Sequence, residues 1–348
     1  MAKRILKVAF LGFGNAGQAV AEMLLAKEAK IEKVYDAKVV VTAIATGSKG
    51  NLVCAEGVDL VRALDDVKKY GKFTNEAELS KLTTMEIVEQ ADYDVIAEMT
   101  PLNIFTGQPA ISHIEGAFAR GKDAITANKG PIAWKYKELK AMAAEKGVKF
   151  FYETTVMDGT PVFNLVEKTL PLAEVTEVSG ILNSTTNFIL EEMAAGCDYE
   201  DIMERGRQLG FVEADPAMDI EGYDAAAKIT ALLNVLMDAG ITPDKVDRKG
   251  IEDITMADIE EAAAEGKVIK LLCRGYRDEA GNVIAKVAPE KVEAGDLLAT
   301  VNSTTSVVSI TTDLMKKITV VEHEPEIEQT AYGVFGDMLR AIELMVKL

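Results

Sequence analysis

Short apolar runs alternate with amphipathic stretches through the first 150 residues. Runs typical of strands lie at 7–12, 38–46, 92–100, 122–128 and 147–154. Stretches with apolar residues at helical spacing lie between them, at 18–30, 111–121 and 133–147. Strands that alternate with helices and short turns are typical of a parallel α/β sheet. The pattern therefore predicts an α/β domain over residues 1–150.

The pattern changes after residue 155. Apolar residues at helical spacing predict helices at 160–170, 185–196, 197–210 and 224–240. Strand-like runs follow at 174–184, 267–278, 282–292 and 306–313. We predict a second, α+β domain over residues 151–325, with a mixed or antiparallel sheet. A last helical stretch ends the chain, and we expect residues 326–348 to return to the first domain.

Composition narrows the range of partners. The 348 residues carry 56 acidic and 38 basic side chains, a net charge of −18. Such a surface repels phosphate backbones and anionic lipid, so neither nucleic acid nor membrane is an expected partner. No window approaches 18 uninterrupted apolar residues. The three cysteines are far apart and lack a C-x-x-C pair, which favours a reduced, cytoplasmic location.

A glycine motif, GFGNAG, joins the first strand to the first helix. In this context Gly12 permits a tight turn, Gly14 lets the backbone approach a pyrophosphate, and Gly17 allows close packing of helix on strand. The helix amino terminus, which begins at Asn15 and Ala16, then faces the phosphate charge. The motif predicts a dinucleotide-binding domain of the Rossmann type.

The end of the second strand bears on the choice of cofactor. Enzymes that use NAD usually carry an acidic residue there, bonded to the ribose 2′-hydroxyl. Here residues 45–50 read ATGSKG, with no acid, and Ser48 and Lys49 are placed to hold a 2′-phosphate. We predict NADP, with NAD as the alternative.

Lysines are the candidates for proton transfer. Hydride transfer between an alcohol and a carbonyl needs a proton partner for the oxygen. The only two histidines, His113 and His323, are not expected to be catalytic. Lys129 follows a strand of the first domain, where α/β sheets hold ligands, although a solvated loop lysine is the alternative. Lys228 lies one helical turn after Asp224. The two residues form either an ordinary solvent-exposed ion pair or, if their helix is buried, a functional pair.

Polar residues before two helices suggest an amino-acid site. The stretch NSTTNFILEEM places Asn183, Ser184 and Thr185 at a helix start, where they form an anion site or merely cap the helix. Glu213 and Asp219 are candidates to bind an ammonium or to orient a lysine. An anion site beside carboxylates suits a small amino acid, which carries both charges.

Taken in order, the motifs resemble those of homoserine dehydrogenases. They are GFGNAG, MTPLNIFTGQPA, TANKGP, YETTVMDGTP, GILNSTTNFIL and GFVEADPAMDIEGYDAAAK, from about residue 5 to about residue 312. The resemblance is to the short, single-function form without an ACT domain. It implies reduction of L-aspartate 4-semialdehyde to L-homoserine with NADPH or NADH, a role in threonine and methionine biosynthesis, and a homodimer.

The resemblance also implies roles for individual residues. Lys129 and Lys228 would be the catalytic lysines, and one of them would pass the proton to the nascent alkoxide. Asp224 would orient the reacting oxygen and lysine, and Glu213 would hold the substrate ammonium. Asp219 would shape the same pocket, and Asn183, Ser184 and Thr185 would face the substrate carboxylate. Thr100 and Asn128 would lie along the nicotinamide. A monovalent cation, Na⁺ or K⁺, would lie near Glu153, Val156, Asp158 and Thr160.

The chain departs from the family pattern at three places. Ser184 stands where glycine is usual, VMDGTP (156–161) replaces a more glycine-rich stretch at the cation site, and residues 320–339 lack the glycine-rich G-x-G-A-G loop and carry Glu322, Glu324 and Glu326 instead. The alternatives are a related NAD(P)-dependent oxidoreductase for another small amino or hydroxy aldehyde, and a non-catalytic dinucleotide-binding protein.

Overall fold

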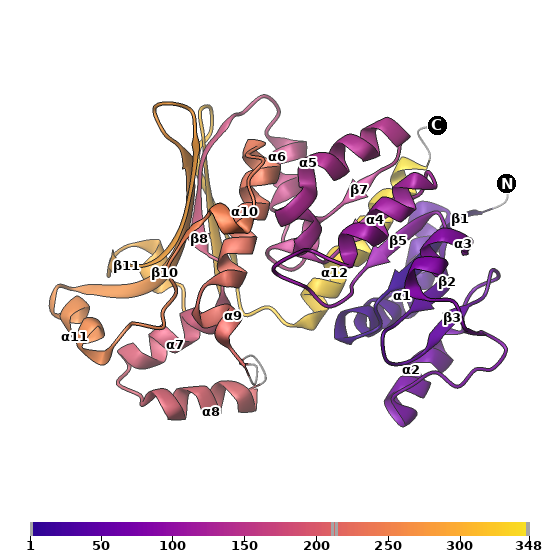
Figure 1. Cartoon of the computed structure of the whole chain (residues 1–348), viewed down its shortest axis with the longest axis horizontal. Helices are drawn as coiled ribbons and strands as arrows, with labels where there is room; N and C mark the ends of the chain where they lie inside the picture. The colour runs from indigo at the N-terminus through magenta and orange to yellow at the C-terminus, as the bar shows by residue number, and fades with distance from the viewer. Residues whose placement is uncertain (1–2, 210–211, 213–214, 346–348) are drawn as a thin grey trace. The chain divides into compact units, whose positions relative to one another are not determined.

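The chain folds into two compact units in a computed structural model that describes residues 3–209, 212 and 215–345. One unit comprises residues 1–161 together with 326–348, and the other comprises residues 162–325. Figure 1 follows the chain through both, and each is described separately below.

The first unit is built on a seven-stranded sheet with the order β4-β3-β2-β1-β5-β6-β7. The five strands from β2 to β7 in this order pair in parallel, while β3 and β4 add an antiparallel edge. Their bounds are β1 Arg4–Leu11, β2 Ala37–Ala45, β3 Asn51–Val53, β4 Leu79–Ser80, β5 Val95–Glu98, β6 Asp123–Thr126 and β7 Phe150–Phe151. The predicted Rossmann-type sheet is confirmed.

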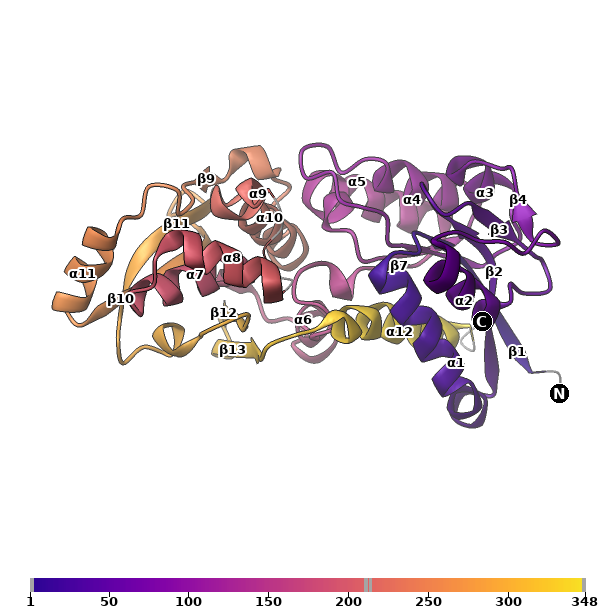
Figure 2. The same ribbon diagram turned by 90° about the horizontal axis from the view of Figure 1, so that it is seen from below.

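Helices cover both faces of this sheet, as Figure 2 shows. On one face α1 (Asn15–Tyr35), α2 (Leu60–Tyr70) and α12 (Ile327–Leu344) bury apolar residues against β1 and β2. On the other face α3 (Thr84–Gln90), α4 (Ala110–Ala119) and α5 (Lys129–Lys146) enclose a second core. Burial on both faces explains why the strands read as continuous apolar runs.

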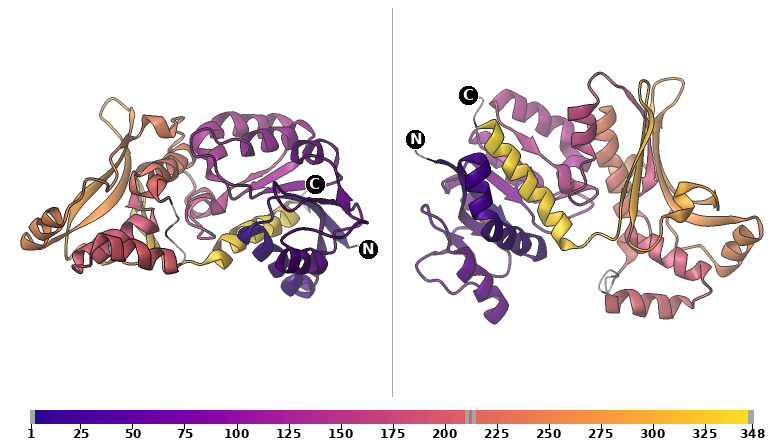
Figure 3. Two further views of the ribbon diagram at one scale, coloured as in Figure 1. Left: turned by 60° about the horizontal axis from the view of Figure 1, so that its bottom comes forward. Right: turned by 180° about the vertical axis from the view of Figure 1, so that it is seen from behind.

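The C-terminal helix α12 packs beside α1 and against the segment that follows β7 (Figure 3). The Thr154 hydroxyl donates to the Thr330 carbonyl at 3.0 Å. A side chain at Gly159 or Gly333 would collide with the facing segment, so glycine permits this close approach. The first unit therefore continues past the predicted boundary at residue 150, through the 3₁₀ turn η1 (Glu153–Thr155), to Pro161.

The second unit carries a six-stranded sheet with the order β13-β12-β8-β10-β11-β9. Neighbouring strands pair antiparallel except β9, which pairs parallel to β11. Their bounds are β8 Val175–Ile181, β9 Asp247–Arg248, β10 Lys267–Arg277, β11 Val283–Glu293, β12 Ser306–Thr312 and β13 Lys316–Glu322. The expected mixed sheet is confirmed.

The helix α10 (Tyr223–Met237) packs directly on this sheet. A side chain at Gly275 of β10 would collide with Leu233, so glycine brings the strand against the helix. The other elements are α6 Phe163–Thr169, α7 Ser184–Ala194, α8 Tyr199–Leu209, α9 Ala217–Ile220, α11 Met256–Ala264 and the 3₁₀ turns η2 Pro243–Lys245 and η3 Leu297–Thr300. None of the helices in the described part of the chain has the length and apolar character needed to cross a lipid bilayer.

Candidate functional site

The glycine loop lies between β1 and α1, at the carboxyl end of the parallel strands. Gly12 has φ +104°, and a Cβ there would lie 2.4 Å from the Met99 carbonyl oxygen. A Cβ on Gly17 would lie 2.7 Å from the Gly12 carbonyl oxygen, whereas one on Gly14 would enter open space. Gly14 is the N-cap of α1 and no acid occupies the first turn, where Asn15 and Ala16 stand. The loop therefore offers free approach and helix N–H groups to a phosphate.

The loop after β2 holds Ser48 and Lys49 beside that edge of the sheet. The Thr46 hydroxyl donates to the Gly50 carbonyl at 2.8 Å and accepts from the Lys49 backbone N–H at 2.8 Å. The Lys49 carbonyl in turn accepts from the Phe73 N–H at 2.9 Å. Ser48 is exposed and Lys49 is half-buried.

The ends of β5 and β6 bring Thr100, Asn128 and Lys129 together. The Asn128 amide donates to the Thr100 carbonyl at 3.1 Å, and its oxygen accepts from the Gly130 N–H at 2.9 Å. Asn128 thereby caps α5, the helix that begins at Lys129. The two residues predicted to line the nicotinamide are thus bonded to each other.

A buried carboxylate supports this group. Glu98 is 0% exposed, and its Oε1 accepts from both the backbone N–H and the hydroxyl of Thr100. The Nδ1 atom of His113, on α4, lies 3.4 Å from the same oxygen. His113 therefore contacts Glu98 inside the core. Sequence patterns gave no reason to pair Glu98 with His113. A glutamate at the end of an apolar strand was nevertheless a signal that Glu98 itself could be a buried functional residue.

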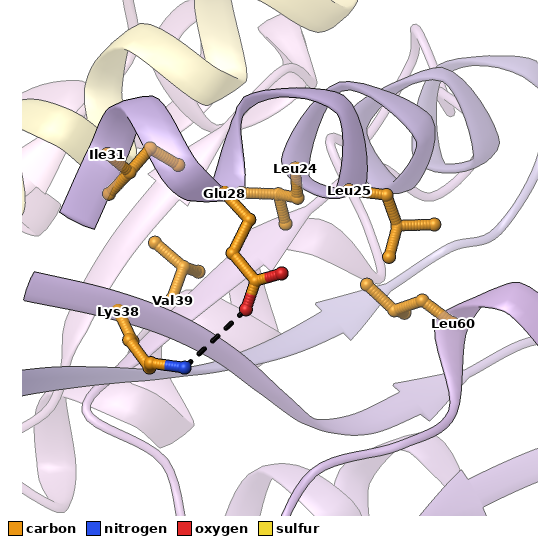
Figure 4. A pocket seen from close by; sticks show the side chains of 7 residues that line it. All are labelled: Leu24, Leu25, Glu28, Ile31, Lys38, Val39 and Leu60. Atoms are coloured by element: carbon orange, nitrogen blue, oxygen red, sulfur yellow. Dashed lines mark ion pairs between the residues drawn. The ribbon is translucent and has the colours of Figure 1, made fainter. Parts of the chain in front are cut away.

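A small cavity of about 90 Å³ opens elsewhere in the first unit (Figure 4). It lies between the middle of α1, the amino end of β2 and the start of α2, on the side of β2 away from the Ser48 loop. Its polar groups, Glu28 and Lys38, pair with each other at 3.7 Å. The cavity is separate from the dinucleotide site, and its lining residues are Leu24, Leu25, Glu28, Ile31, Lys38, Val39 and Leu60.

In the second unit, Lys228 and Asp224 form a shielded ion pair on α10. Lys228 Nζ lies 3.3 Å from Asp224 Oδ2, and the two side chains are only 18% and 14% exposed. The ammonium also donates to the Leu182 carbonyl at the end of β8, at 2.7 Å. Behind the pair, burial raises the pKa of the Cys273 thiol to about 12, so this cysteine stays protonated. The pair is therefore not an ordinary solvent-exposed ion pair.

Asn183 joins this pair to Asp219. Its Nδ2 donates to Asp219 Oδ1 at 2.7 Å and to Asp224 Oδ2 at 3.0 Å. Its Oδ1 accepts from the Thr186 N–H at 2.9 Å, which caps α7. Burial, with the nearby Asp224 carboxylate, raises the pKa of Asp219, while hydrogen bonds from Asn183 and Thr185 and the Lys228 charge act in the opposite direction. The Asn183 amide thus links the Asp219 and Asp224 carboxylates, and Asp224 in turn pairs with Lys228.

Ser184 and Thr185 begin α7 beside this network. The Ser184 hydroxyl donates to the Thr304 carbonyl at 3.0 Å, so it is directed toward the 301–305 loop. Thr185 is buried and hydrogen-bonds Asp219. Glu213, the predicted partner of the substrate ammonium, lies outside the described residues.

The predicted cation turn lies after β7 in the first unit. Glu153 and Val156 are buried, Asp158 has φ +44°, and the Thr160 N–H donates to the Met157 carbonyl at 2.9 Å. The Asp158 carboxylate accepts from the Thr330 hydroxyl. No group of three His, Cys, Asp or Glu side chains that could hold a metal ion occurs among the described residues.

Comparison with known proteins covers nearly the whole chain. Residues 161–339 match the family model of homoserine dehydrogenase, and residues 12–153 match that of its NAD-binding domain. The chain belongs to the homoserine dehydrogenase family. Homoserine dehydrogenase from Methanocaldococcus jannaschii is 36% identical over 96% of this chain and 98% of its own length.

Relatives in this homoserine dehydrogenase family are described with both dinucleotides. The Pseudomonas canavaninivorans protein, 34% identical over 96% of this chain and 95% of its own, is an NAD⁺-dependent homoserine dehydrogenase. A hyperthermophilic archaeal homoserine dehydrogenase solved with NADPH is 26% identical, with a TM-score of 0.82 over 99% of this chain and 98% of its own. This chain is an NAD(P)-dependent oxidoreductase, so the non-catalytic alternative is wrong.

Proposed function

We propose that Lys228 delivers the proton when this homoserine dehydrogenase reduces L-aspartate 4-semialdehyde to L-homoserine. The observation that carries the proposal is the Lys228 ammonium, fixed by the Asp224 carboxylate and the Leu182 carbonyl while 18% of the side chain stays exposed. An ammonium held in this way has a defined direction, and its exposed part can meet a substrate oxygen. A positioned acid of this kind is what carbonyl reduction requires.

The charges balance without any further group. When bound, the reduced dinucleotide supplies the hydride that becomes the new C–H bond at the aldehyde carbon. The carbonyl oxygen takes a proton from Lys228 and becomes the hydroxyl of homoserine. Asp224 stabilises the ammonium before transfer, and solvent then returns a proton to the amine.

The substrate's own charges suit the residues around Lys228. The N-terminus of α7, at Ser184 and Thr185, offers helix N–H groups to the substrate carboxylate. Asp219, which accepts from Asn183 and Thr185, is proposed to shape the same pocket, and Glu213 is proposed for the substrate ammonium. The Asn183 amide is fully engaged by Asp219, Asp224 and Thr186, so we assign it to positioning these groups.

An assay with the natural aldehyde tests the substrate. NADPH oxidation by the purified protein is expected with L-aspartate 4-semialdehyde. Turnover of another small amino or hydroxy aldehyde, with aspartate semialdehyde inert, would instead favour the related oxidoreductase. The direction of the Ser184 hydroxyl, toward Thr304, argues against a narrowed carboxylate site.

Lys49 is proposed to select NADP. Lys49→Glu is expected to raise the KM for NADPH at least about tenfold and to change the KM for NADH little, because only NADPH carries a 2′-phosphate. Lys27→Glu, at an exposed position of α1, changes the net charge equally and serves as the control. Equal effects of Lys49→Glu on both cofactors would remove Lys49 from the 2′-phosphate site.

A monovalent cation, Na⁺ or K⁺, is proposed for the 153–160 turn. Burial, with the nearby Glu153 carboxylate, raises the pKa of the Asp337 carboxyl to about 7, although Arg340 pairs with it at 3.1 Å and acts in the opposite direction. A cation near Glu153 would further offset the negative charge of these acids. Activity is expected to be higher in KCl or NaCl than in tetramethylammonium chloride at equal ionic strength. Identical activity in all three salts would rule the cation out.

The homodimer also stays a prediction, which sedimentation of the purified protein tests.

A further inference from the structure

A lysine that plays no part in the proposed reaction is buried in the second unit. Lys270, on β10, is 3% exposed. Its ammonium donates to the Val301 carbonyl at 2.6 Å, to Asn187 Oδ1 at 2.9 Å and to Asn302 Oδ1 at 3.3 Å. A buried ammonium costs several kcal/mol of desolvation unless oxygen acceptors surround it, as they do here. The contacts join β10, α7 and the loop of residues 301–305.

The same loop is tied to α7 by three further side chains. The Asn187 amide donates to the carbonyls of Val301 and Ser303 at 3.1 and 3.0 Å. The Glu191 carboxylate accepts from the Ser303 N–H. The Ser184 hydroxyl donates to the Thr304 carbonyl at 3.0 Å. We call Ser184, Asn187, Glu191 and Lys270 the loop clamp.

The loop clamp reaches the first residue of α7. Ser184 and Thr185 form the helix terminus proposed above for the substrate carboxylate, and Ser184 is bonded to the loop. Ser303 has φ +56°, a backbone conformation that a free loop of non-glycine residues rarely adopts. The clamp therefore fixes this loop beside the N-terminus of α7.

We propose that the loop clamp, with Lys270 as its centre, positions the 301–305 loop as a wall of the substrate site and so sets the affinity for the amino-acid aldehyde. This inference rests on the proposed function of the α7 terminus. Lys270 is a positioning residue, because it acts through the loop and its ammonium bonds Val301, Asn187 and Asn302 rather than the Lys228–Asp224 pair.

The charges around Lys270 make the clamp sensitive to pH. Burial lowers the pKa of the ammonium from 10.5 to about 8, while the Glu191 carboxylate acts in the opposite direction. Glu290, its register partner on β11, is engaged by Arg274 and Lys286, and the buried residues of α11 are the apolar Ile259 and Ala262. Residues 301–305 carry no ionisable side chain. Above pH 8 the neutral amine has one donor fewer for its three acceptors.

The test separates substrate affinity from chemistry. Lys270→Met is expected to raise the KM for L-aspartate 4-semialdehyde about tenfold, leaving kcat within about threefold and the Kd for NADPH unchanged. Lys267→Met, at a half-buried lysine of the same strand that pairs with Glu265 and Glu293 away from the loop, is the matched control and is expected to leave all three constants unchanged. The wild-type KM is expected to rise as the pH passes 8, and this rise should be missing in Lys270→Met.

Two results would overturn the proposal: a folded Lys270→Met protein with an unchanged KM, or one whose kcat alone falls. If Lys270→Met does not fold, Ser184→Gly decides, because it removes one clamp contact at the helix start. It is expected to raise KM about threefold with little loss of stability. An unchanged KM in folded Ser184→Gly then contradicts the clamp. Failure of the proton-donor assignment would appear instead as an unchanged kcat in Lys228→Met. The loop clamp and the proton-donor assignment can therefore fail separately.

Discussion

Lys228→Met is expected to lower kcat by about 10²–10⁴-fold, the usual effect of removing a positioned acid. Methionine has nearly the length of lysine but gives no proton, so the hydride acceptor oxygen would have to be protonated by water. The Kd for NADPH should stay near the wild-type value, because the glycine loop and the Ser48 loop belong to the first unit. Stopped-flow kinetics with saturating aldehyde and NADPH measures kcat, and quenching of protein fluorescence measures the Kd.

Two comparisons sharpen this test. Lys245→Met, at a lysine that is 69% exposed, removes the same charge from the second unit and should leave kcat unchanged. Asp224→Asn keeps the hydrogen bond from Asn183 but removes the counter-charge of Lys228, and kcat should fall less than in Lys228→Met. A folded Lys228→Met protein with wild-type kcat would transfer the role of proton donor to another group, with Lys129 the first candidate.

Gly12→Ala is expected to lower the free energy of unfolding by about 3 kcal/mol or more, since the alanine would adopt a strained φ and also overpack the loop. The Cβ would lie 2.4 Å from the Met99 carbonyl oxygen at φ +104°. Residue 12 follows β1 and Met99 follows β5, and these two strands pair in the sheet. Neither backbone segment can therefore move away without disturbing the sheet. Thermal unfolding of the purified protein, expected to shift by about 5–10 °C, measures the loss.

Gly14→Ala is the matched substitution with the opposite result. Its Cβ meets nothing within 4 Å and its φ is −78°, so unfolding should change by no more than about 1 kcal/mol. The methyl group would nevertheless occupy the space through which a pyrophosphate approaches the backbone, and the Kd for NADPH should rise at least about tenfold. Unchanged NADPH binding in Gly14→Ala would show that the phosphate does not lie over Gly14.

The first domain was largely readable from the sequence. Buried parallel strands leave continuous apolar runs, and the surrounding helices keep a 3.6-residue period, so local pattern and final structure agree. The requirement for glycine at Gly17 was readable for the same reason, because it arises from the adjacent Gly12 carbonyl, whereas the contact of Gly12 with Met99 at the end of β5 depends on the fold. The Asp224–Lys228 pair was also readable, since their spacing of one helical turn is local.

Several short elements were missed. The elements that were not predicted include the helices α2, α3, α9 and α11 and the strands β3, β4, β9 and β13. β13 is an edge strand whose residues are mostly half-exposed, so it lacks the apolar run that marks a buried strand. In α11, only Ile259 and Ala262 are buried, and an alanine-rich stretch with so few large apolar residues carries little periodic signal.

Sequence by itself determined the family, the dinucleotide loop and the identity of the charged residues around α10. Tertiary structure decided what each of them contacts. It made Asn183 the bridge between Asp219 and Asp224, placed the Leu182 carbonyl under Lys228, and brought Glu98 to His113 and Lys270 to the 301–305 loop. These contacts join residues from different strands and helices. Sequence periodicity reports which face of an element is buried, but the partner that meets a buried polar group is set by how the elements pack.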